Sequence, residues 1–351
     1  MNRQYGTSST RCNLAALALV AHMTFFSGQM RLISVALFQV ITWCPWTSAA
    51  PYPERTVTIA VPYAAGGGID VVTRMLAQRL NERLGQPFVV ENRLGAGGVI
   101  ASAYVAKAAN DGYTLLMASD AQLAIQVSLR KTLAYDPTAD YAPIAIVGST
   151  PFALLVSPSL PVTSVGDLIK LAKAKPSELT YGSSGIGGTP HLVTEMFMSM
   201  SNTKMRQIPY KGTAQALSDV VAGRVNVIFS GLTGVVPLLR EGKLRALGVS
   251  SQSRIGILPN VPTIAEAGIP GFDAVGFVML VAPAGTSKDI TTKLYNELKA
   301  VVMAPDIRQK YESIGYVAEQ SPPPDELQNF IKRQIERWGD VVERAGLRHS
   351  Q

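Results

Sequence analysis

An apolar strand, a glycine-rich turn and a helix follow one another repeatedly along this 351-residue chain, and this alternation restricts the fold more than any other feature. Residues 57–62 (VTIAVP) are almost all apolar, as expected for a strand covered on both faces. The glycines at 66–68 precede a helix with apolar residues at i, i+3 and i+4, which Gly85 ends. The alternation favours a doubly wound α/β domain with a parallel sheet.

The same pattern starts again after residue 150. Residues 152–156 are an expected strand, and residues 165–174 an expected helix with Ser164 as its N-cap. Thr189 and Pro190 are typical of an N-cap and a first helical residue. Two similar α/β halves are therefore predicted to follow one another.

The C-terminal segments are predicted to return to the first half. Residues 278–282 are strand-like, and residues 290–303 form an amphipathic helix. Asp325 and Gln328 resemble a capping box after three prolines. The final helix is expected to bury Leu327, Phe330, Ile331, Ile335, Trp338 and Val342.

Residues 1–50 are predicted to be a secretory signal peptide. They contain three arginines and no acidic residue, and the apolar run 32–46 leads to small residues just before Pro51. The run is shorter than the ~20 apolar residues that cross a membrane, although an N-terminal anchor is the alternative. A second apolar run lies upstream, so we expect Met30 to be the true start.

Charge and cysteine content argue against several functions. The net charge of +7 falls to +4 for the 301 residues after the predicted signal peptide, which gives little support to a nucleic-acid partner. Both cysteines lie in the first 50 residues, and the chain has three histidines. We therefore expect no metal, no cofactor and no disulfide framework.

Three turns between a predicted strand and a helix are candidate binding segments: 66–68 with Asp70, 183–188 before Thr189, and 210–213 with Lys211. Glycines let a ligand approach the backbone, and helix N-termini suit a carboxylate or phosphate. Neither the P-loop nor the dinucleotide motif is present. Taken alone, each turn has a structural alternative: a tight turn, helix capping by the aspartate, or a solvated lysine.

No catalytic arrangement stands out. Ser184 has Gly182 before it but Ile186 after it, so the Gly-x-Ser-x-Gly elbow is incomplete. His191 and Glu195 are spaced to share a metal ion, but no further His or Cys completes a zinc site. We expect binding rather than catalysis.

Longer motifs run in order over nearly the whole chain after residue 50 and include VPYAAGGGID at 61–70, VENRLGAGG at 90–98, PYKG at 209–212 and LPNVPT at 258–263. With these motifs the chain resembles a known family, the periplasmic solute receptors of tripartite tricarboxylate transporters, of the Bordetella-uptake (Bug) type.

The resemblance implies a periplasmic binding protein-like fold of type II, with two α/β lobes that close on a ligand about a hinge. We expect residues 51–150 and 273–351 in lobe 1 and residues 151–272 in lobe 2. It further implies a periplasmic monomer that captures a small carboxylate and delivers it to a two-component membrane permease.

It also implies which residues bind the ligand. Relatives often have Asp where Ser230 stands, so the cleft is expected to be less negative and to suit a di- or tricarboxylate. The alternatives are a receptor that presents its ligand to a sensor kinase and a secreted hydrolase that uses Ser184 and His191. The implied ligand-binding residues are Ala65, Gly67, Gly68, Asp70, Ser119, Ser183, Ser184, Thr189, His191, Lys211, Gly212 and Ser230.

Overall fold

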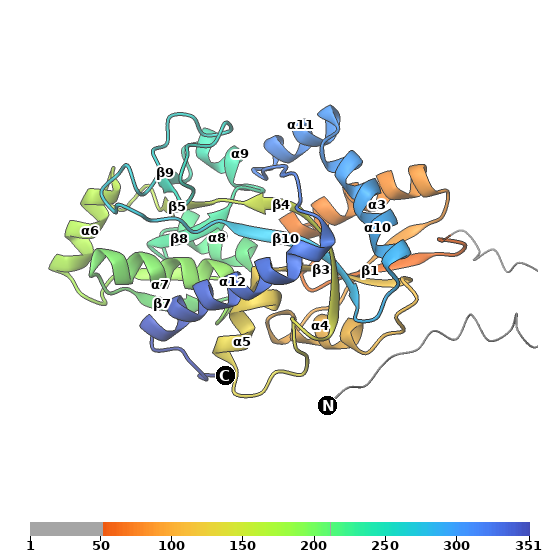
Figure 1. Ribbon diagram of the computed structural model, residues 1–351. Helices are drawn as coiled ribbons and strands as arrows, with labels where there is room; N and C mark the ends of the chain where they lie inside the picture. The colour runs from red at the N-terminus through yellow and green to blue at the C-terminus, as the bar shows by residue number, and fades with distance from the viewer. Residues whose placement is uncertain (1–51, 211) are drawn as a thin grey trace, which may run out of the picture. The chain divides into compact units, whose positions relative to one another are not determined.

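The computed structural model describes residues 52–210 and 212–351 (Figure 1). The predicted signal peptide, Met30 and Lys211 therefore lie outside the described residues. Residues Tyr52–Gln351 form one compact unit that holds two five-stranded sheets. Each sheet, with the helices that cover it, is called a lobe below.

The first lobe is built on a sheet of order β2-β1-β3-β10-β4. Strand β1 pairs in parallel with β2 and β3, whereas β10 runs antiparallel to both β3 and β4. The strands are β1 (Val57–Val61), β2 (Phe88–Asn92), β3 (Thr114–Ser119), β4 (Tyr141–Thr150) and β10 (Gly276–Pro283). The helices are α3 (Gly68–Leu84), η1 (Ala96–Gly98), α4 (Val99–Ala106), α10 (Lys288–Val302) and α11 (Pro305–Ser313).

The second lobe has the sheet order β7-β6-β8-β5-β9. Strand β6 is parallel to β7 and β8, and β5 is antiparallel to β8 and β9. The strands are β5 (Phe152–Val156), β6 (Thr180–Ser183), β7 (Arg206–Pro209), β8 (Val227–Gly231) and β9 (Arg245–Val249). The helices are α6 (Val165–Ala174), α7 (Thr189–Ser201), α8 (Thr213–Val221) and α9 (Val235–Arg240).

The prediction of a parallel sheet is wrong in one respect, because both sheets are mixed. The antiparallel strands, β5 and β10, are those next to the points where the chain crosses from one lobe to the other. Strand β5 follows β4 after a single residue, and β10 brings the chain back from the second lobe. Neither strand is joined to its sheet neighbour by the helical crossover that a parallel pair requires.

Two segments belong to the hydrophobic cores of both lobes. Helix α12 (Pro324–Arg344) buries Leu327 and Ile331 in the first core and Trp338 and Val342 in the second, and crosses between the lobes in Figure 1. The π-helical turn η2 (Ala121–Ile125) and helix α5 (Gln126–Leu129) are shared in the same way. Leu123 lies in the first core, and Ala124, Ile125 and Leu129 lie in the second.

Several predicted helix ends are confirmed. Gly85 ends α3 in the left-handed conformation, at φ 71°, which a glycine adopts without strain. Ser164 caps α6 by accepting the Asp167 N–H at 3.1 Å. In the final helix, Phe330 and Ile335 are only partly buried, whereas the other four predicted core residues are buried.

Two predicted caps are wrong. Gly188, not Thr189, is the N-cap of α7, because the Thr189 hydroxyl donates to a carboxylate of the first lobe instead. Helix α12 begins at Pro324, so Asp325 lies inside its first turn. The Gln328 amide donates to the Tyr141 carbonyl oxygen at 3.0 Å rather than closing a capping box.

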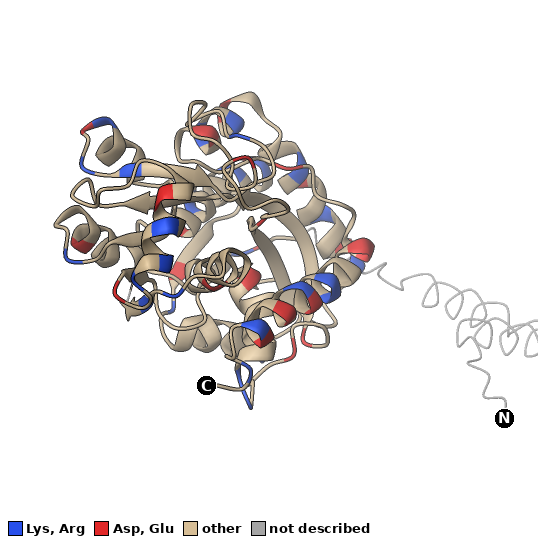
Figure 2. Cartoon of the chain, turned by 90° about the vertical axis from the view of Figure 1, so that its left-hand side faces the viewer, with Lys and Arg blue, Asp and Glu red and all other residues tan. Residues whose placement is uncertain are grey.

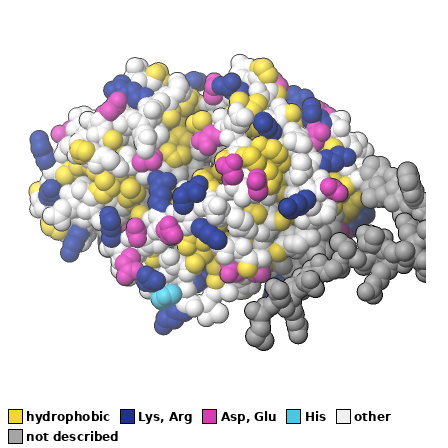
Figure 3. Space-filling view, viewed as in Figure 1, with side chains coloured by type: hydrophobic (Ala, Val, Ile, Leu, Met, Phe, Trp, Pro, Cys, Tyr) yellow, Lys and Arg dark blue, Asp and Glu magenta, His cyan; other side chains and the backbone are white. Residues whose placement is uncertain are grey.

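Basic and acidic residues are interspersed along the helices in Figure 2, and their side chains are interspersed over the face seen in Figure 3. The face in Figure 3 shows no broad area of positive charge, which is the feature that would indicate a nucleic-acid partner. Among the residues described, no helix has the length and apolar content to cross a bilayer.

Candidate functional site

Asp70, which is 2% exposed, holds the first glycine turn in place by hydrogen bonds. Its Oδ2 accepts the Gly66 N–H at 2.8 Å and the Arg74 Nε–H at 3.0 Å, and its Oδ1 accepts the Asn92 amide at 2.8 Å. Burial alone would raise the pKa of Asp70, but the hydrogen bonds from Arg74, Asn92 and Gly66 outweigh it and hold the pKa below its ordinary value. Asp70 therefore fixes the shape of the turn.

The turn itself is open to solvent at residues 64–67, which include Ala65 and Gly67. Gly68, the first residue of α3, is held close to the second lobe. A Cβ there would stand 2.7 Å from the Tyr316 hydroxyl and 2.9 Å from the Thr233 hydroxyl. Thr233 in turn donates to the Ile314 carbonyl oxygen at 3.0 Å, so glycine at 68 permits close approach of the lobes.

Ser119 ends β3 within a network of buried hydrogen bonds. Its hydroxyl lies 2.8 Å from the Tyr63 hydroxyl and donates to the Gln122 Oε1 at 3.0 Å. The Gln122 amide then donates to the Gly97 carbonyl oxygen at 2.9 Å. Burial raises the pKa of Tyr63 to about 12, so its hydroxyl stays protonated at neutral pH. The network ties the end of β3 to two glycine turns of the first lobe.

The second-lobe turn at 183–188 is shaped by His191. The Nδ1 of this buried imidazole accepts the Gly187 N–H at 3.0 Å, and its Nε2 lies 3.6 Å from Glu195 Oε1. The Ser183 hydroxyl accepts from the Gln207 amide at 2.8 Å, which anchors the start of the turn. Both imidazole nitrogens thus face partners other than Ser184, so the pairing that a Ser/His hydrolase needs is absent from this part of the structure.

Thr189 connects this turn to the first lobe. Its hydroxyl donates at 2.8 Å to Oδ1 of Asp120, the residue that follows β3. Asp120 is fully enclosed, and burial raises its pKa to about 6 against the lowering effect of hydrogen bonds from Thr189 and the Ala121 N–H. The hydrogen bond between Tyr63 and Ser119 and that between Thr189 and Asp120 thereby connect the first glycine turn, the end of β3 and the start of α7.

The remaining predicted residues take other positions. Gly212 is the N-cap of α8, with an extended backbone. Ser230 lies buried near the end of β8, where its hydroxyl donates to the Gly231 carbonyl oxygen at 2.8 Å. A Cβ on Gly231 would be 3.4 Å from the Thr150 hydroxyl. The end of β8 therefore lies beside the end of β4, where the chain crosses from the first lobe to the second.

Sequence reasoning missed several polar residues at this junction. Asp120 stands next to the predicted Ser119, and its acidic side chain after a buried strand was the available signal. Tyr63 lies within the first recognised motif. Tyr316 comes from a segment far along the chain, so only the fold brings it to Gly68.

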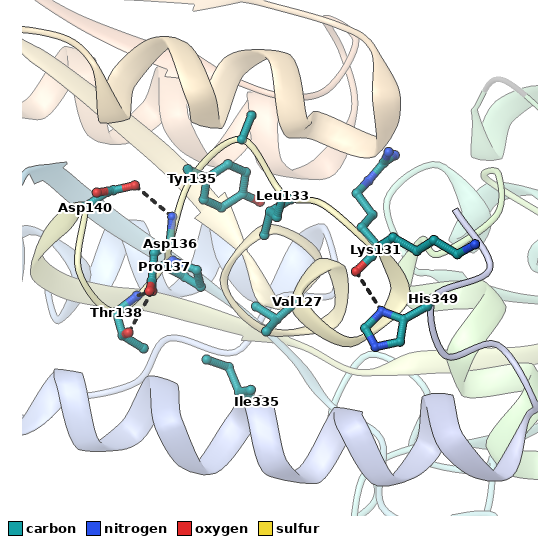
Figure 4. A pocket seen from close by; sticks show the side chains of 12 residues that line it. Val127, Lys131, Leu133, Tyr135, Asp136, Pro137, Thr138, Asp140, Ile335 and His349 are labelled. Carbon is teal, nitrogen blue, oxygen red and sulfur yellow. Dashed lines mark hydrogen bonds between the residues drawn. The ribbon is translucent and has the colours of Figure 1, made fainter.

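A hollow of about 640 Å³ is lined mainly by residues between 127 and 140 (Figure 4). Leu133, Tyr135 and Ile335 form part of its lining, with Asp136 and Asp140 toward one end and Lys131 and His349 toward the other. None of the predicted ligand-binding residues lines it.

Comparison with known proteins identifies the family. Residues 72–347 match the family model described as the tripartite tricarboxylate transporter family receptor. The chain belongs to this family. It is 37% identical over 300 residues to Protein BugT of Bordetella pertussis, a match that covers 85% of this chain and 92% of that protein.

Solved structures with the same fold include two that hold carboxylates. R. palustris Rpa4515 with adipate has a TM-score of 0.80 and 39% identity, and the match covers 84% of this chain and 98% of that one. MatC (Rpa3494) from Rhodopseudomonas palustris with bound malate has a TM-score of 0.77 and 33% identity, with 83% and 100% covered. The predicted receptor family and the two-lobed α/β fold are confirmed.

Proposed function

We propose that this receptor captures a small dicarboxylate between the glycine turns of its two lobes. The observation that carries the proposal is the continuous set of contacts from the Tyr63 hydroxyl through Ser119 and Asp120 to Thr189. It brings the carboxyl end of β3 against the N-terminus of α7. Ligands of open α/β sheets bind beyond the carboxyl ends of strands, which is where these contacts lie.

The chemistry of the turns supports an anionic ligand. The first N–H groups of α3 and α7 have no partner within their own helices, and both helix N-termini carry a partial positive charge. Ser230 adds no negative charge at the end of β8. Relatives in the same family were solved with adipate and with malate, which supports the dicarboxylate class. The Lys211 side chain remains a predicted ligand contact.

Delivery to a two-component permease, with the receptor in the periplasm, completes the proposal. The family description names a transporter receptor, and the predicted signal peptide at residues 1–50 supports export. Retention of a bound solute without chemical change is the activity we expect, since the His191 imidazole is turned toward Gly187 and Glu195.

Closure of the two lobes on the ligand is part of the same proposal, with a hinge near residues 150–151 and 272–275. The ligand favours the closed arrangement because only that arrangement lets it contact both lobes. Small-angle scattering should show compaction when the ligand is added. An unchanged radius of gyration at saturating ligand would contradict closure while leaving binding intact.

The direct test is thermal unfolding of the purified protein with adipate, malate, succinate and citrate, each beside its uncharged amide. A ligand at about 100 times its Kd should stabilise the protein by about 2.7 kcal/mol. That corresponds to a rise in Tm of about 4 °C for a chain of this size. If no acid raises the Tm above its amide, the proposed function is wrong.

A further inference from the structure

Asp120 is a carboxylate enclosed where the two lobes meet, and it is 2% exposed. Its Oδ1 accepts hydrogen bonds from the Thr189 hydroxyl at 2.8 Å and the Ala121 N–H at 3.0 Å. Its Oδ2 is buried and has no hydrogen-bond partner among the described residues. On that side it faces Gly276 at the start of β10, where a Cβ would lie 3.3 Å away.

The first-lobe groups that face Asp120 are neutral hydroxyls. Tyr63 comes from the turn after β1, and Tyr316 comes from the segment after α11. Burial raises the pKa of both phenols, that of Tyr63 to about 12, so neither carries charge at neutral pH. Ser119 adds a further hydroxyl near the same carboxylate. None of these groups supplies the positive charge that a buried carboxylate needs.

The ionisable side chains on the other neighbouring elements have partners other than Asp120. The positive charge of Arg337, on α12, lowers the pKa of Asp120 only slightly. Its guanidinium instead donates to the Asp273 carbonyl oxygen at 2.7 Å and lies 3.5 Å from the Asp273 carboxylate. On α7, His191 faces Gly187 and lies 3.6 Å from Glu195. Among the described residues, Asp120 therefore has no cation as a close partner.

Burial raises the pKa of Asp120 to about 6. At pH 7 most of the molecules would thus carry a negative charge there. A dicarboxylate bound near Ser119 and Thr189 brings a second negative charge beside this one. Like charges within ~4–6 Å disfavour each other's ionised form, so the ligand raises the pKa of Asp120 further.

We propose that Asp120 takes up one proton when a dicarboxylate binds, so that the receptor captures the anion together with a proton. The inference rests on the proposed function and deepens it. The proton comes from solvent, neutralises the carboxylate, and returns to solvent when the ligand leaves. A ligand ammonium group is disfavoured as the neutralising partner, because Oδ2 is enclosed against Gly276.

The direction of the pH dependence follows from this linkage. Because the complex holds the proton more tightly than the free protein, ligand affinity is highest at low pH and falls as the pH rises above about 6. With one proton taken up, Kd should rise by up to tenfold per pH unit until the pH passes the pKa of Asp120 in the complex. Adipate, malate and succinate are almost fully ionised above about pH 6.5, so their own titration adds little there.

The test is isothermal titration calorimetry at pH 7 with adipate, malate and succinate, in phosphate and in Tris. The dependence of the observed enthalpy on the ionisation enthalpy of the buffer counts the protons exchanged. We expect an uptake of about 0.5–0.9 protons per ligand. The Asp120→Asn variant keeps an acceptor for Thr189 and should show almost no uptake, with a Kd that changes by less than about twofold between pH 6.5 and 8.

The exposed Asp340 on α12 supplies the matched control, and Asp340→Asn should exchange protons like the wild type. Binding without proton uptake in the wild type, or uptake that survives in Asp120→Asn, would overturn the inference and leave the proposed function standing. Preferential binding of aspartate or glutamate without proton uptake would also overturn it. Failure of all three acids to bind would overturn the proposed function itself, and this inference with it.

Discussion

The Thr189 hydroxyl, at the first residue of α7, donates a hydrogen bond of 2.8 Å to the carboxylate of Asp120, directly after β3. The bond joins the two lobes in a place from which water is excluded, since Thr189 is 6% exposed and Asp120 is 2% exposed. A charge-assisted bond in such a place contributes more than an exposed one, and its loss leaves the carboxylate further unsatisfied.

Thr189→Val should lower the free energy of unfolding by about 1–3 kcal/mol, because it removes this donor while keeping the side-chain volume. Urea unfolding followed by circular dichroism measures the loss. Thr292→Val, at an exposed position on α10, is the matched control and should change stability by less than about 0.5 kcal/mol. Equal effects of the two substitutions would show that the hydrogen bond between Thr189 and Asp120 does not contribute to the free energy of unfolding.

Asp70→Asn should destabilise the protein at neutral pH by about 1–3 kcal/mol, since a neutral amide cannot accept from Gly66, Arg74 and Asn92 as the carboxylate does. The pKa of Asp70 is lowered in the folded protein, so its stabilisation is present above the unfolded value of about 3.9 and is lost as the pH falls through the folded value.

The stability difference between wild type and Asp70→Asn should therefore be constant from pH 7 to about 5 and shrink below about pH 4. Urea unfolding across this range provides the measurement, with Asp340→Asn as the exposed control. A difference that stays unchanged down to pH 3 would mean that the Asp70 charge does not stabilise the turn.

His191→Ala should weaken ligand binding by about tenfold, because the Gly187 N–H loses its acceptor and the 183–188 turn loses its fixed shape. Titration calorimetry with adipate gives the two Kd values. His349→Ala, at an exposed histidine near the C-terminus, should bind as the wild type does. If the two variants bind equally well, His191 does not position the turn.

Trp338→Ala should cost about 3–5 kcal/mol of stability, because Trp338 is 1% exposed in the second-lobe core. We also expect wild type and variant to unfold in a single transition, since α12 and the η2–α5 segment pack into both cores. Urea unfolding by circular dichroism tests both points, with the exposed Arg333→Ala as control. Two separate transitions in the wild type would show that the lobes unfold independently.

The sequence predicted those parts of the fold that depend on local pattern. The Val57–Val61 strand, the Gly85 helix end and the Ser164 cap follow from apolar runs and from the chemistry of single residues. The antiparallel placement of β5 and β10 was not accessible, because pairing direction depends on where the chain passes between lobes.

The candidate site was likewise predictable only where it depends on local sequence. The glycine turns were recognisable because they follow apolar strands, whereas the bond from Thr189 to Asp120 joins residues 69 positions apart. Asp70 and His191 were predicted as ligand contacts, and in the structure their side chains hold the turns in shape. Their contact with a ligand stays a prediction. The family motifs identify the turns that are candidates for ligand binding, and the fold identifies the side chains that hold these turns in shape.

Titration calorimetry of the purified protein with adipate and, in parallel, with its uncharged diamide tests the central claim most directly. We predict saturable binding of adipate at one site per chain, with an affinity at least about 100-fold above that of the diamide, since two charge-assisted contacts are lost without the carboxylates. Equal affinity for the diamide, or no binding of adipate, malate, succinate or citrate, would contradict a receptor for small carboxylates.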